Sequence, residues 1–131
     1  MGAERQRAST GNKYELQVGF SRALRVGDWV AVAGTAPIGD DGVTVGVGDL
    51  YVQTVRCFDI AERALAQVGA SIGHVVRTRV MLTDITRWAE AAQAHGERFA
   101  EVRPASTFVE VSALIDPDWL VEIEMDAIVD D

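Results

Sequence analysis

The stretch "LVEIEMDAIV", residues 120–129, alternates between two kinds of side chain along its length. One side is apolar throughout: Val121, Ile123, Met125, Ala127 and Val129. The other side carries Glu122, Glu124, Asp126 and Ile128. Successive side chains of a strand point to opposite faces of its sheet, so this pattern predicts a strand with one face on a hydrophobic core. The opposite face mixes charge with apolar groups, which suits a subunit interface, although scattered apolar residues on a free surface would look similar.

Other segments of the chain show the same two-residue period. The runs "GFSRALRV" (19–26) and "WVAVAG" (29–34) are joined by Gly-Asp, which predicts a β-hairpin. The runs "HVVRTRVML" (74–82) and "STFVEV" (106–111) predict two further strands. Together with residues 120–129, these segments supply enough strands for one sheet.

Two segments have a helical period instead. Asp49 is placed to cap a helix from about Leu50 to Val68, with Gly69 as its stop. Its apolar stripe consists of Leu50, Cys57, Phe58, Ala61, Leu65 and Val68. A second helix fits residues 87–100, with Thr86 as its cap and an apolar face of Trp88, Ala91, Ala92, His95 and Phe99. The order ββαβαββ predicts an α+β fold, a single β-sheet with two helices on one face.

Composition limits the class of protein. A chain of 131 residues is one ordinary domain, which we expect over residues 14–131 after a flexible polar tail at residues 1–13. The net charge of -8 argues against nucleic acid and against an anionic membrane as partners. A single cysteine excludes an intrachain disulfide and favours a reducing, cytoplasmic compartment, and no apolar run is long enough to span a bilayer.

Metal and cofactor motifs are incomplete. His95-Gly96-Glu97 matches half of a zinc-deaminase signature, but the Pro-Cys-x-x-Cys half is missing from a chain with one cysteine. His95 is therefore better explained as a helix residue near the edge of the core. Gly46-Val47-Gly48 lacks the third glycine of a dinucleotide fingerprint. We expect neither a metal nor a cofactor.

The acidic side of residues 120–129 needs positive partners. Arg77 and Arg79 form a matching basic pair on another predicted strand, so a cross-strand or inter-subunit ion-pair ladder is expected for Glu124 and Asp126. For Glu122 a second interpretation stays open, a carboxylate with a raised pKa that activates water.

Two arginines could hold an anionic ligand. Arg22 alternates with apolar neighbours, an unusual place for a merely solvated charge. Arg103 precedes Pro104, which should hold it extended and fix its direction. A guanidinium can grip a carboxylate with two hydrogen bonds, although a surface ion pair is an equally good explanation for both residues.

Three segments resemble the Rid/YjgF family, also called the L-PSP endoribonuclease family. They are "GFSRALRVGDWVAVAGTAP", "VGASIGHVVRTRVMLTDI" and "RPASTFVEVSALIDPDWLVEIEMDAIV", so the resemblance runs from about Gly19 to Val129. It implies a chorismate-mutase-like fold and a homotrimer with three clefts between neighbouring subunits. It also implies hydrolysis of small reactive enamines and imines to a keto acid and ammonia, without metal or cofactor.

The resemblance also assigns site positions, and several depart from the family pattern. The arginine that grips the substrate carboxylate in active members is replaced by Ser106, the tyrosine of the first strand by Phe20, and a cysteine by Phe108. A Ser-Gly pair becomes Ala33-Gly34, whereas the glutamate associated with water activation is retained as Glu122. Ser106 can donate a hydrogen bond but supplies no charge for a buried carboxylate.

Three functions follow as hypotheses. The first is a cofactor-independent hydrolase of small imines or enamines, in which Ser106 and Glu122 line an inter-subunit cleft. Glu122 would position water, Arg22 or Arg103 would hold an anionic group, and Ser106 and Thr107 would hydrogen-bond the ligand. The second is a non-catalytic, metabolite-binding or regulatory trimer, because the arginine, tyrosine and cysteine positions have changed. The third, ranked last because the chain is acidic, is an endoribonuclease.

Overall fold

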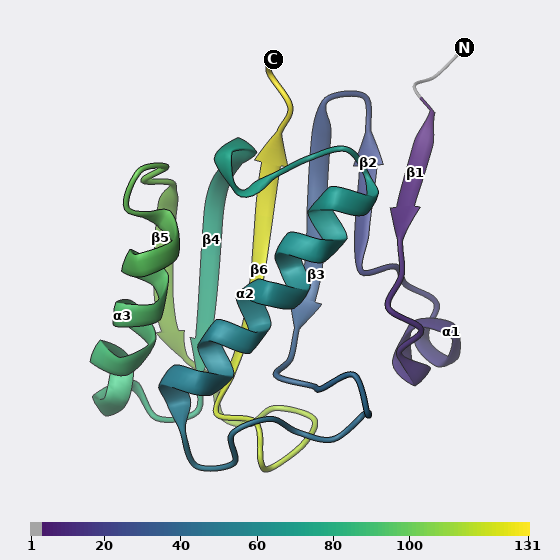
Figure 1. The fold of residues 1–131 in the computed structure, drawn as a ribbon. Helices are drawn as coiled ribbons and strands as arrows, with labels where there is room; N and C mark the ends of the chain where they lie inside the picture. Colours follow the sequence, from purple (N-terminus) through teal and green to yellow (C-terminus); the bar gives the residue numbers. More distant parts are fainter. Residues whose placement is uncertain (1–3) are drawn as a thin grey trace.

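A computed structural model describes residues 4–131, and its central feature is one six-stranded sheet (Figure 1). The elements are β1 (Arg5–Ala8), α1 (Lys13–Val18), β2 (Ala23–Val26), β3 (Trp29–Thr35), α2 (Leu50–Gln67), η1 (Ile72–His74), β4 (Val75–Leu82), η2 (Ile85–Arg87), α3 (Trp88–Phe99), β5 (Ala105–Glu110) and β6 (Val121–Ile128). The strand order is β1-β2-β3-β6-β4-β5. Only β4 and β5 are parallel, as expected for strands connected through a helix.

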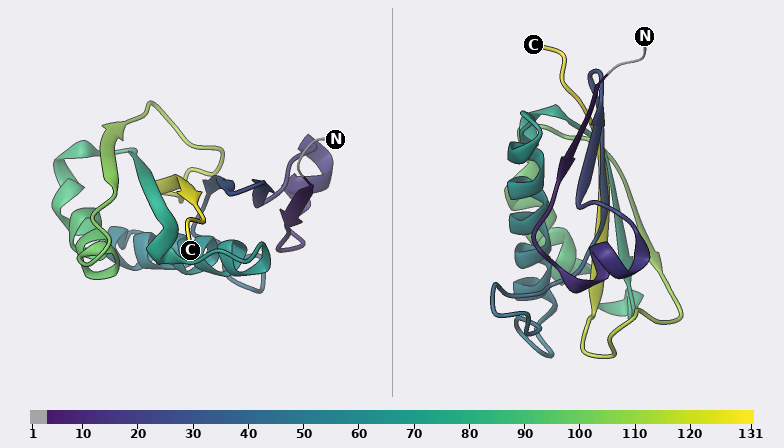
Figure 2. Two further views of the ribbon diagram at one scale, coloured as in Figure 1. Left: turned by 90° about the horizontal axis from the view of Figure 1, so that it is seen from above. Right: turned by 90° about the vertical axis from the view of Figure 1, so that its right-hand side faces the viewer.

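The two long helices lie on the same side of the sheet (Figure 2). This confirms the predicted α+β arrangement, with a third, short helix, α1, added at the β1 edge. We call the side that α2 and α3 cover the helix face and the opposite side the open face. None of the helices over residues 4–131 has the length and hydropathy that a bilayer crossing needs.

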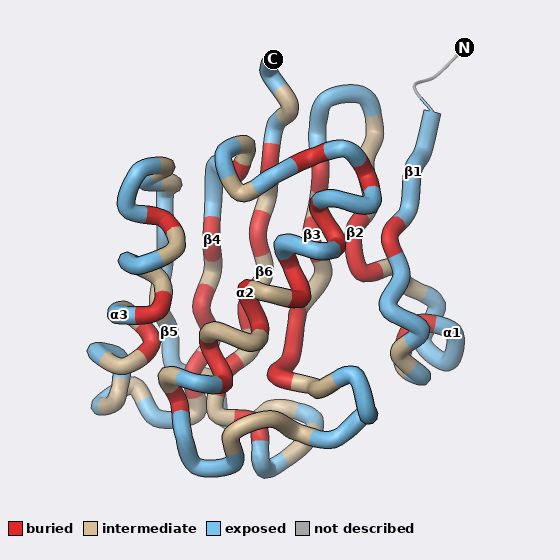
Figure 3. Tube along the Cα trace, in the orientation of Figure 1, coloured by how far each residue is buried: buried red, intermediate tan, exposed pale blue. Residues whose placement is uncertain are grey.

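The core lies between the helices and the sheet, where the alternating patterns predicted it (Figure 3). In β6 the burial alternates residue by residue, with the apolar set buried and the acidic set half-buried on the open face. The helices contribute Phe58, Ala61, Leu65, Ala91 and Phe99. Trp88, at the start of α3, was expected on the apolar face but is exposed. Val76 is exposed as well, at a β-bulge between Val75 and Arg77 that shifts the register of β4.

The expected tail is mostly ordered structure. Residues 1–3 lie outside the described residues, but residues 5–8 form β1 on the edge of β2. Helix α1 begins at Lys13 with a capping box, in which Asn12 accepts a hydrogen bond from Tyr14 and Glu15 accepts one from the Asn12 backbone. This segment is held by backbone pairing and polar caps. Neither requires apolar residues at regular spacing, so the sequence shows no sign of a strand or helix here.

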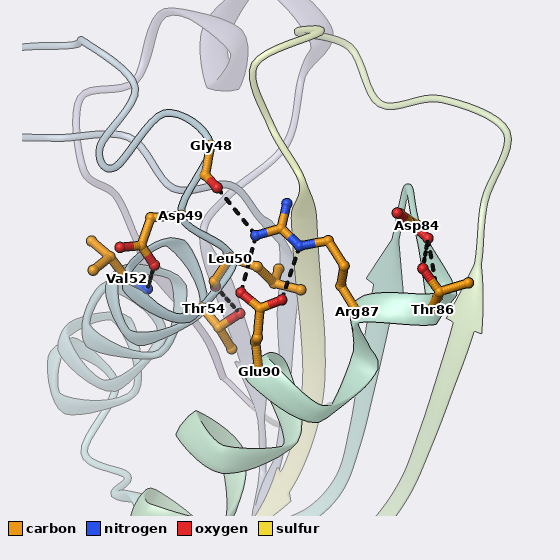
Figure 4. Close-up of polar contacts among 9 residues, drawn as sticks. All are labelled: Gly48, Asp49, Leu50, Val52, Thr54, Asp84, Thr86, Arg87 and Glu90. Carbon is orange, nitrogen blue, oxygen red and sulfur yellow. Dashed lines mark hydrogen bonds and ion pairs between the residues drawn. The ribbon is translucent and has the colours of Figure 1, made fainter.

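Helix α2 is capped as predicted, whereas the start of α3 is not (Figure 4). The Asp49 carboxylate accepts a hydrogen bond of 3.0 Å from the Val52 backbone. Thr86 does not cap α3, because Asp84 accepts hydrogen bonds from its backbone and hydroxyl and thereby caps η2. The first turn of α3 is instead fixed by Arg87, which pairs with Glu90 and donates to the Gly48 carbonyl before α2.

We expect Asp49→Ala to lower the free energy of unfolding by about 1 kcal/mol, because the backbone N–H of Val52 loses its acceptor. Urea unfolding followed by circular dichroism would measure the change. Asp49→Asn is the matched control, since an amide oxygen can still accept that bond and stability should stay close to that of the unmodified protein. An equal loss in both variants would contradict the capping role.

Candidate functional site

Glu122 is a half-buried carboxylate on the open face of β6. Its carboxyl carbon lies 3.3 Å from the place where a Cβ on Gly34 would be, so the absence of a side chain at Gly34 makes room for it. Among residues 4–131 it has no hydrogen-bond or ion-pair partner. Burial raises the pKa of Glu122, and the positive charge of Arg22 only partly opposes this shift. A carboxylate with a raised pKa holds a proton more readily than an ordinary glutamate, which suits a group that accepts and returns one.

A hollow of about 390 Å³ lies on the open face and extends as far as Ala33, the sequence neighbour of Gly34. It is lined by Arg7, Gly19, Phe20, Ser21, Leu24, Ala31, Val32 and Ala33. The predicted site residue Phe20 therefore lies in this hollow, whereas Gly34 and Glu122 are not among its lining residues. Arg7 is a cation at this hollow that the sequence analysis missed, because the four residues of β1 are too short and too polar to show a period.

Arg22 is close enough to Glu122 to influence its charge, but it opens onto a different cavity. Its guanidinium carbon lies 5.0 Å from the centre of the Phe20 ring, and the residue is buried. The cavity that it lines also contains Arg56, Ile60 and Arg63 of α2, which places the cavity on the helix face. In one protomer, the structure therefore places Gly34 against Glu122 and brings the charge of Arg22 close enough to act on it, while Phe20 packs against Arg22.

Arg103 is not part of this group. The prediction that Pro104 would hold it extended is wrong, since its φ is 52°, in the left-handed region. The reason is the end of α3, where the Arg103 N–H donates a 2.8 Å hydrogen bond to the Phe99 carbonyl and the chain reverses. Arg103 is exposed and lies just before β5. The first residue of β5 is level with Asp126 of β6, and Asp126 is about 13 Å along that strand from Glu122.

Ser106 points to the helix face, away from Glu122. It pairs with the buried Thr78 in register, and its hydroxyl lies 2.7 Å from that of Thr78 and 3.4 Å from Nε2 of His95. Ser106 and Glu122 therefore lie on opposite faces of the sheet, two strands apart. They do not share a cleft within one protomer, and the expectation that they line a cleft between subunits stays a prediction. Period-two alternation orders the side chains of β5, but it does not say which set faces the helices.

Thr107, the neighbour of Ser106, is exposed on the open face opposite Arg79. Arg79 forms an ion pair with Glu124, as the sequence analysis expected. Arg77 and Asp126 are opposite in register but form no ion pair within the described part of the chain. The predicted ion-pair ladder is therefore confirmed only for Arg79 and Glu124.

His95 is a residue at the edge of the core, as predicted. It is half-buried, its ring contacts Phe58, Phe99 and Phe108, and its Nε2 lies 2.7 Å from the Thr78 hydroxyl. Burial lowers the pKa of His95, which favours the neutral imidazole. The Phe108 ring fills the space beside it, so the Phe108 position contributes packing at the edge of the sheet.

Comparison with known proteins places these features in a wider group. Residues 10–129 match the sequence model of a protein family described as endoribonuclease L-PSP. The chain is 32% identical to the 3-aminoacrylate deaminase RutC of Acinetobacter baylyi, over 77% of this chain and 79% of that protein. It is 39% identical to the protein SCO2049 of Streptomyces coelicolor, over 93% of this chain and 90% of that protein.

A crystal structure gives the same result for the fold. Rv2704 of Mycobacterium tuberculosis, a member of the YjgF/YER057c/UK114 family, superposes with a TM-score of 0.87 and 45% sequence identity. The match covers 96% of this chain and all of that one. It confirms the architecture predicted from the resemblance.

Proposed function

The chain belongs to the endoribonuclease L-PSP family, also called the Rid/YjgF family, and from that premise we propose that it hydrolyses a small reactive enamine or imine. The observation that carries this proposal is Glu122, a half-buried carboxylate on the open face that has no hydrogen-bond or ion-pair partner among residues 4–131. The similarity to a 3-aminoacrylate deaminase supports the same class of reaction.

The proposed chemistry needs one proton acceptor and water. An enamine first takes a proton from solvent on carbon and becomes an iminium ion. Glu122 then accepts a proton from water as the water oxygen bonds to the iminium carbon, and it returns that proton to the nitrogen of the resulting carbinolamine. The carbon–nitrogen bond breaks, the hydroxyl proton passes to solvent as the carbonyl forms, and ammonia leaves without any change in oxidation state. A carboxyl group whose pKa is raised by burial suits both halves of this exchange.

Arg7 lines the hollow on the same face as Glu122, whereas Arg22 opens onto the helix face. Within one protomer Arg7 is level with Asp126 and not with Glu122, so it serves the hollow and does not reach the carboxylate. A planar guanidinium can bind a carboxylate with two hydrogen bonds. Phe20 would form an apolar wall for a ligand there. We therefore assign to Arg7 the binding of an anionic group in the hollow.

We propose in addition that the protein is a homotrimer assembled through the open face. Trp29 and Ile128 lie opposite each other on this face, and each leaves more than two-fifths of its surface exposed. The half-buried acidic residues of β6 lie beside them. Assembly would bring Thr107, which lies at the other edge of the sheet, to the hollow of a neighbouring subunit. Sedimentation equilibrium tests this, and a stable folded monomer at micromolar concentration would contradict it.

The activity is tested by generating imines from a series of amino acids with an amino-acid oxidase and trapping the surviving imine with semicarbazide. Hydrolysis by the protein should lower the yield of trapped product. Parallel series of acidic, neutral and aromatic amino acids would show whether Arg7 selects for charge. Unchanged trapping across all series would contradict the proposal.

The pH dependence of the same reaction gives a second expected result. Glu122 must be ionised to accept a proton, and burial raises its pKa above the ordinary value of 4.5. As pH falls, kcat/KM should therefore decline at a pH above 4.5 rather than around it. A decline centred at or below 4.5 would rule out Glu122 as the group that titrates.

A non-catalytic, ligand-binding role is the second candidate. It is favoured by Ser106, whose hydroxyl is engaged with Thr78 instead of facing an anion. A ligand that raises the melting temperature without being consumed would support it.

A further inference from the structure

A second cavity, separate from the open face, lies on the helix face of the sheet. It has a volume of about 510 Å³, within the range of small-molecule sites. Its walls come from residues 9–12 and the first turn of α1, from α2, and from the loop at residues 36–44. Trp119 lines it as well. Glu122 does not line this cavity, so a ligand here would not be the substrate of the proposed hydrolysis.

Arg22 is the most buried cation of this cavity. Only 5% of the residue is exposed, and its Nε is buried without a hydrogen-bond partner. Its whole guanidinium makes no hydrogen bond or ion pair within residues 4–131. Glu15, an acidic neighbour, has both carboxylate oxygens bound by Ser9, Thr10 and Asn12. A buried cation without a partner is costly, and an anion bound in the cavity would supply that partner.

Two further arginines extend the positive charge toward solvent. The Arg56 side chain is 15% exposed and that of Arg63 is 58% exposed, so exposure increases from Arg22 outward. Both pair with one carboxylate, Asp40, whose own side chain is 83% exposed. An exposed ion pair of this kind is weak and can yield to a stronger anion.

The net charge of the lining has the opposite sign to that of the whole protein. Four cations, Lys13, Arg22, Arg56 and Arg63, face two carboxylates, Asp40 and Asp116, whereas the chain carries a net charge of -8. Apolar surface is present too, from Trp119, Tyr14, Ile38 and Ile60. The Tyr14 and Trp119 rings meet edge to face, with centroids 6.4 Å apart. Such a lining suits an anion that carries a flat or apolar body.

We propose that this cavity binds a small organic anion, a carboxylate or phosphate monoester with an aromatic or apolar body. Arg22 binds the anionic group at the buried end with its planar guanidinium, and Arg56 provides a second positive charge nearer the mouth. Tyr14 and Trp119 contact the body of the ligand. The site belongs to one protomer and does not depend on the open face.

Phenyl phosphate and benzoate are the probes, with inorganic phosphate and uncharged benzyl alcohol for comparison. Titration calorimetry of the intact protein at low ionic strength should show binding of one or both aromatic anions, weaker binding of inorganic phosphate and none of benzyl alcohol. Phenyl phosphate against benzoate distinguishes a phosphate from a carboxylate ligand.

Arg22→Gln should weaken binding by about tenfold or more. Arg98→Gln is the control, because Arg98 pairs with Asp59 and Glu62 and does not line the cavity, and it should bind as the unmodified protein does.

Nuclear magnetic resonance tests the contact itself, even if Arg22→Gln does not fold. Arg22→Lys keeps the charge and identifies the Arg22 Nε–H signal by its disappearance from the spectrum. In the unmodified protein, that signal should shift on addition of the anion and stay in place with benzyl alcohol. An unmoved signal at saturating anion, no binding of either aromatic anion, or equal affinity in folded Arg22→Gln would each overturn the proposal. The imine-trapping assay is independent of these results.

Discussion

Glu122→Gln should lower the turnover of imines by about 100-fold or more, because an amide of the same shape cannot accept a proton from water. The carboxylate has no partner among residues 4–131, so the substitution breaks no hydrogen bond or ion pair. Steady-state kinetics with the imine-trapping assay would measure the loss as a fall in kcat.

The matched control for this prediction is Glu124→Gln, on the same strand and the same face. Glu124 is paired with Arg79, and its loss should leave kcat within about twofold if it has only a structural role. Undiminished turnover in Glu122→Gln, or an equal loss in both variants, would contradict the assignment of Glu122.

Stability provides an independent check on the same variant. The pKa of Glu122 is raised in the folded state, so ionisation of this carboxyl group opposes folding. The neutral carboxyl group therefore stabilises the folded protein at low pH, and this stabilisation is lost as pH rises through the raised pKa. Glutamine is neutral at every pH and avoids this loss. At pH 7, Glu122→Gln should therefore be at least as stable as the unmodified protein while being inactive. An inactive and clearly destabilised variant would point to misfolding instead.

Phe58→Ala should lower the free energy of unfolding by roughly 3–5 kcal/mol, the largest change in stability expected here. Phe58 is fully buried in α2, and its ring meets those of Phe99 and His95 edge to face, with centroids 5.3 and 5.7 Å away. Truncation would leave a cavity where α2, α3 and the sheet meet. Urea unfolding followed by circular dichroism would measure the change.

Leu16→Ala is the control for the core prediction, because 94% of Leu16 is exposed on α1. Its effect should stay within about 0.5 kcal/mol, as for most surface substitutions. A loss below about 1 kcal/mol in Phe58→Ala would mean that the neighbouring rings collapse into the space or that the helices pack less tightly than described.

Most of the fold was predictable from local patterns. The alternation in residues 120–129 and the helical stripe after Asp49 were correct because burial of one face imposes a period on the sequence. The segment at residues 5–18 escaped prediction because edge pairing and a capping box leave no such period. The reversal at Arg103 escaped for a related reason, since a bond to the end of α3 outweighed the local preference before proline.

The candidate site was predictable only in part. The sequence by itself determined the elements, the sheet and the retained carboxylate, because each depends on residue type and near-neighbour spacing. The tertiary structure alone decided that Ser106 faces the helices, that Arg7 faces the hollow on the open face and that Arg22 lines a separate cavity on the helix face. These depend on which side of each strand meets the core and on which distant strands become neighbours. An alternating strand has the same sequence pattern whichever of its two sides meets the helices. Only packing against distant parts of the chain decides which side that is.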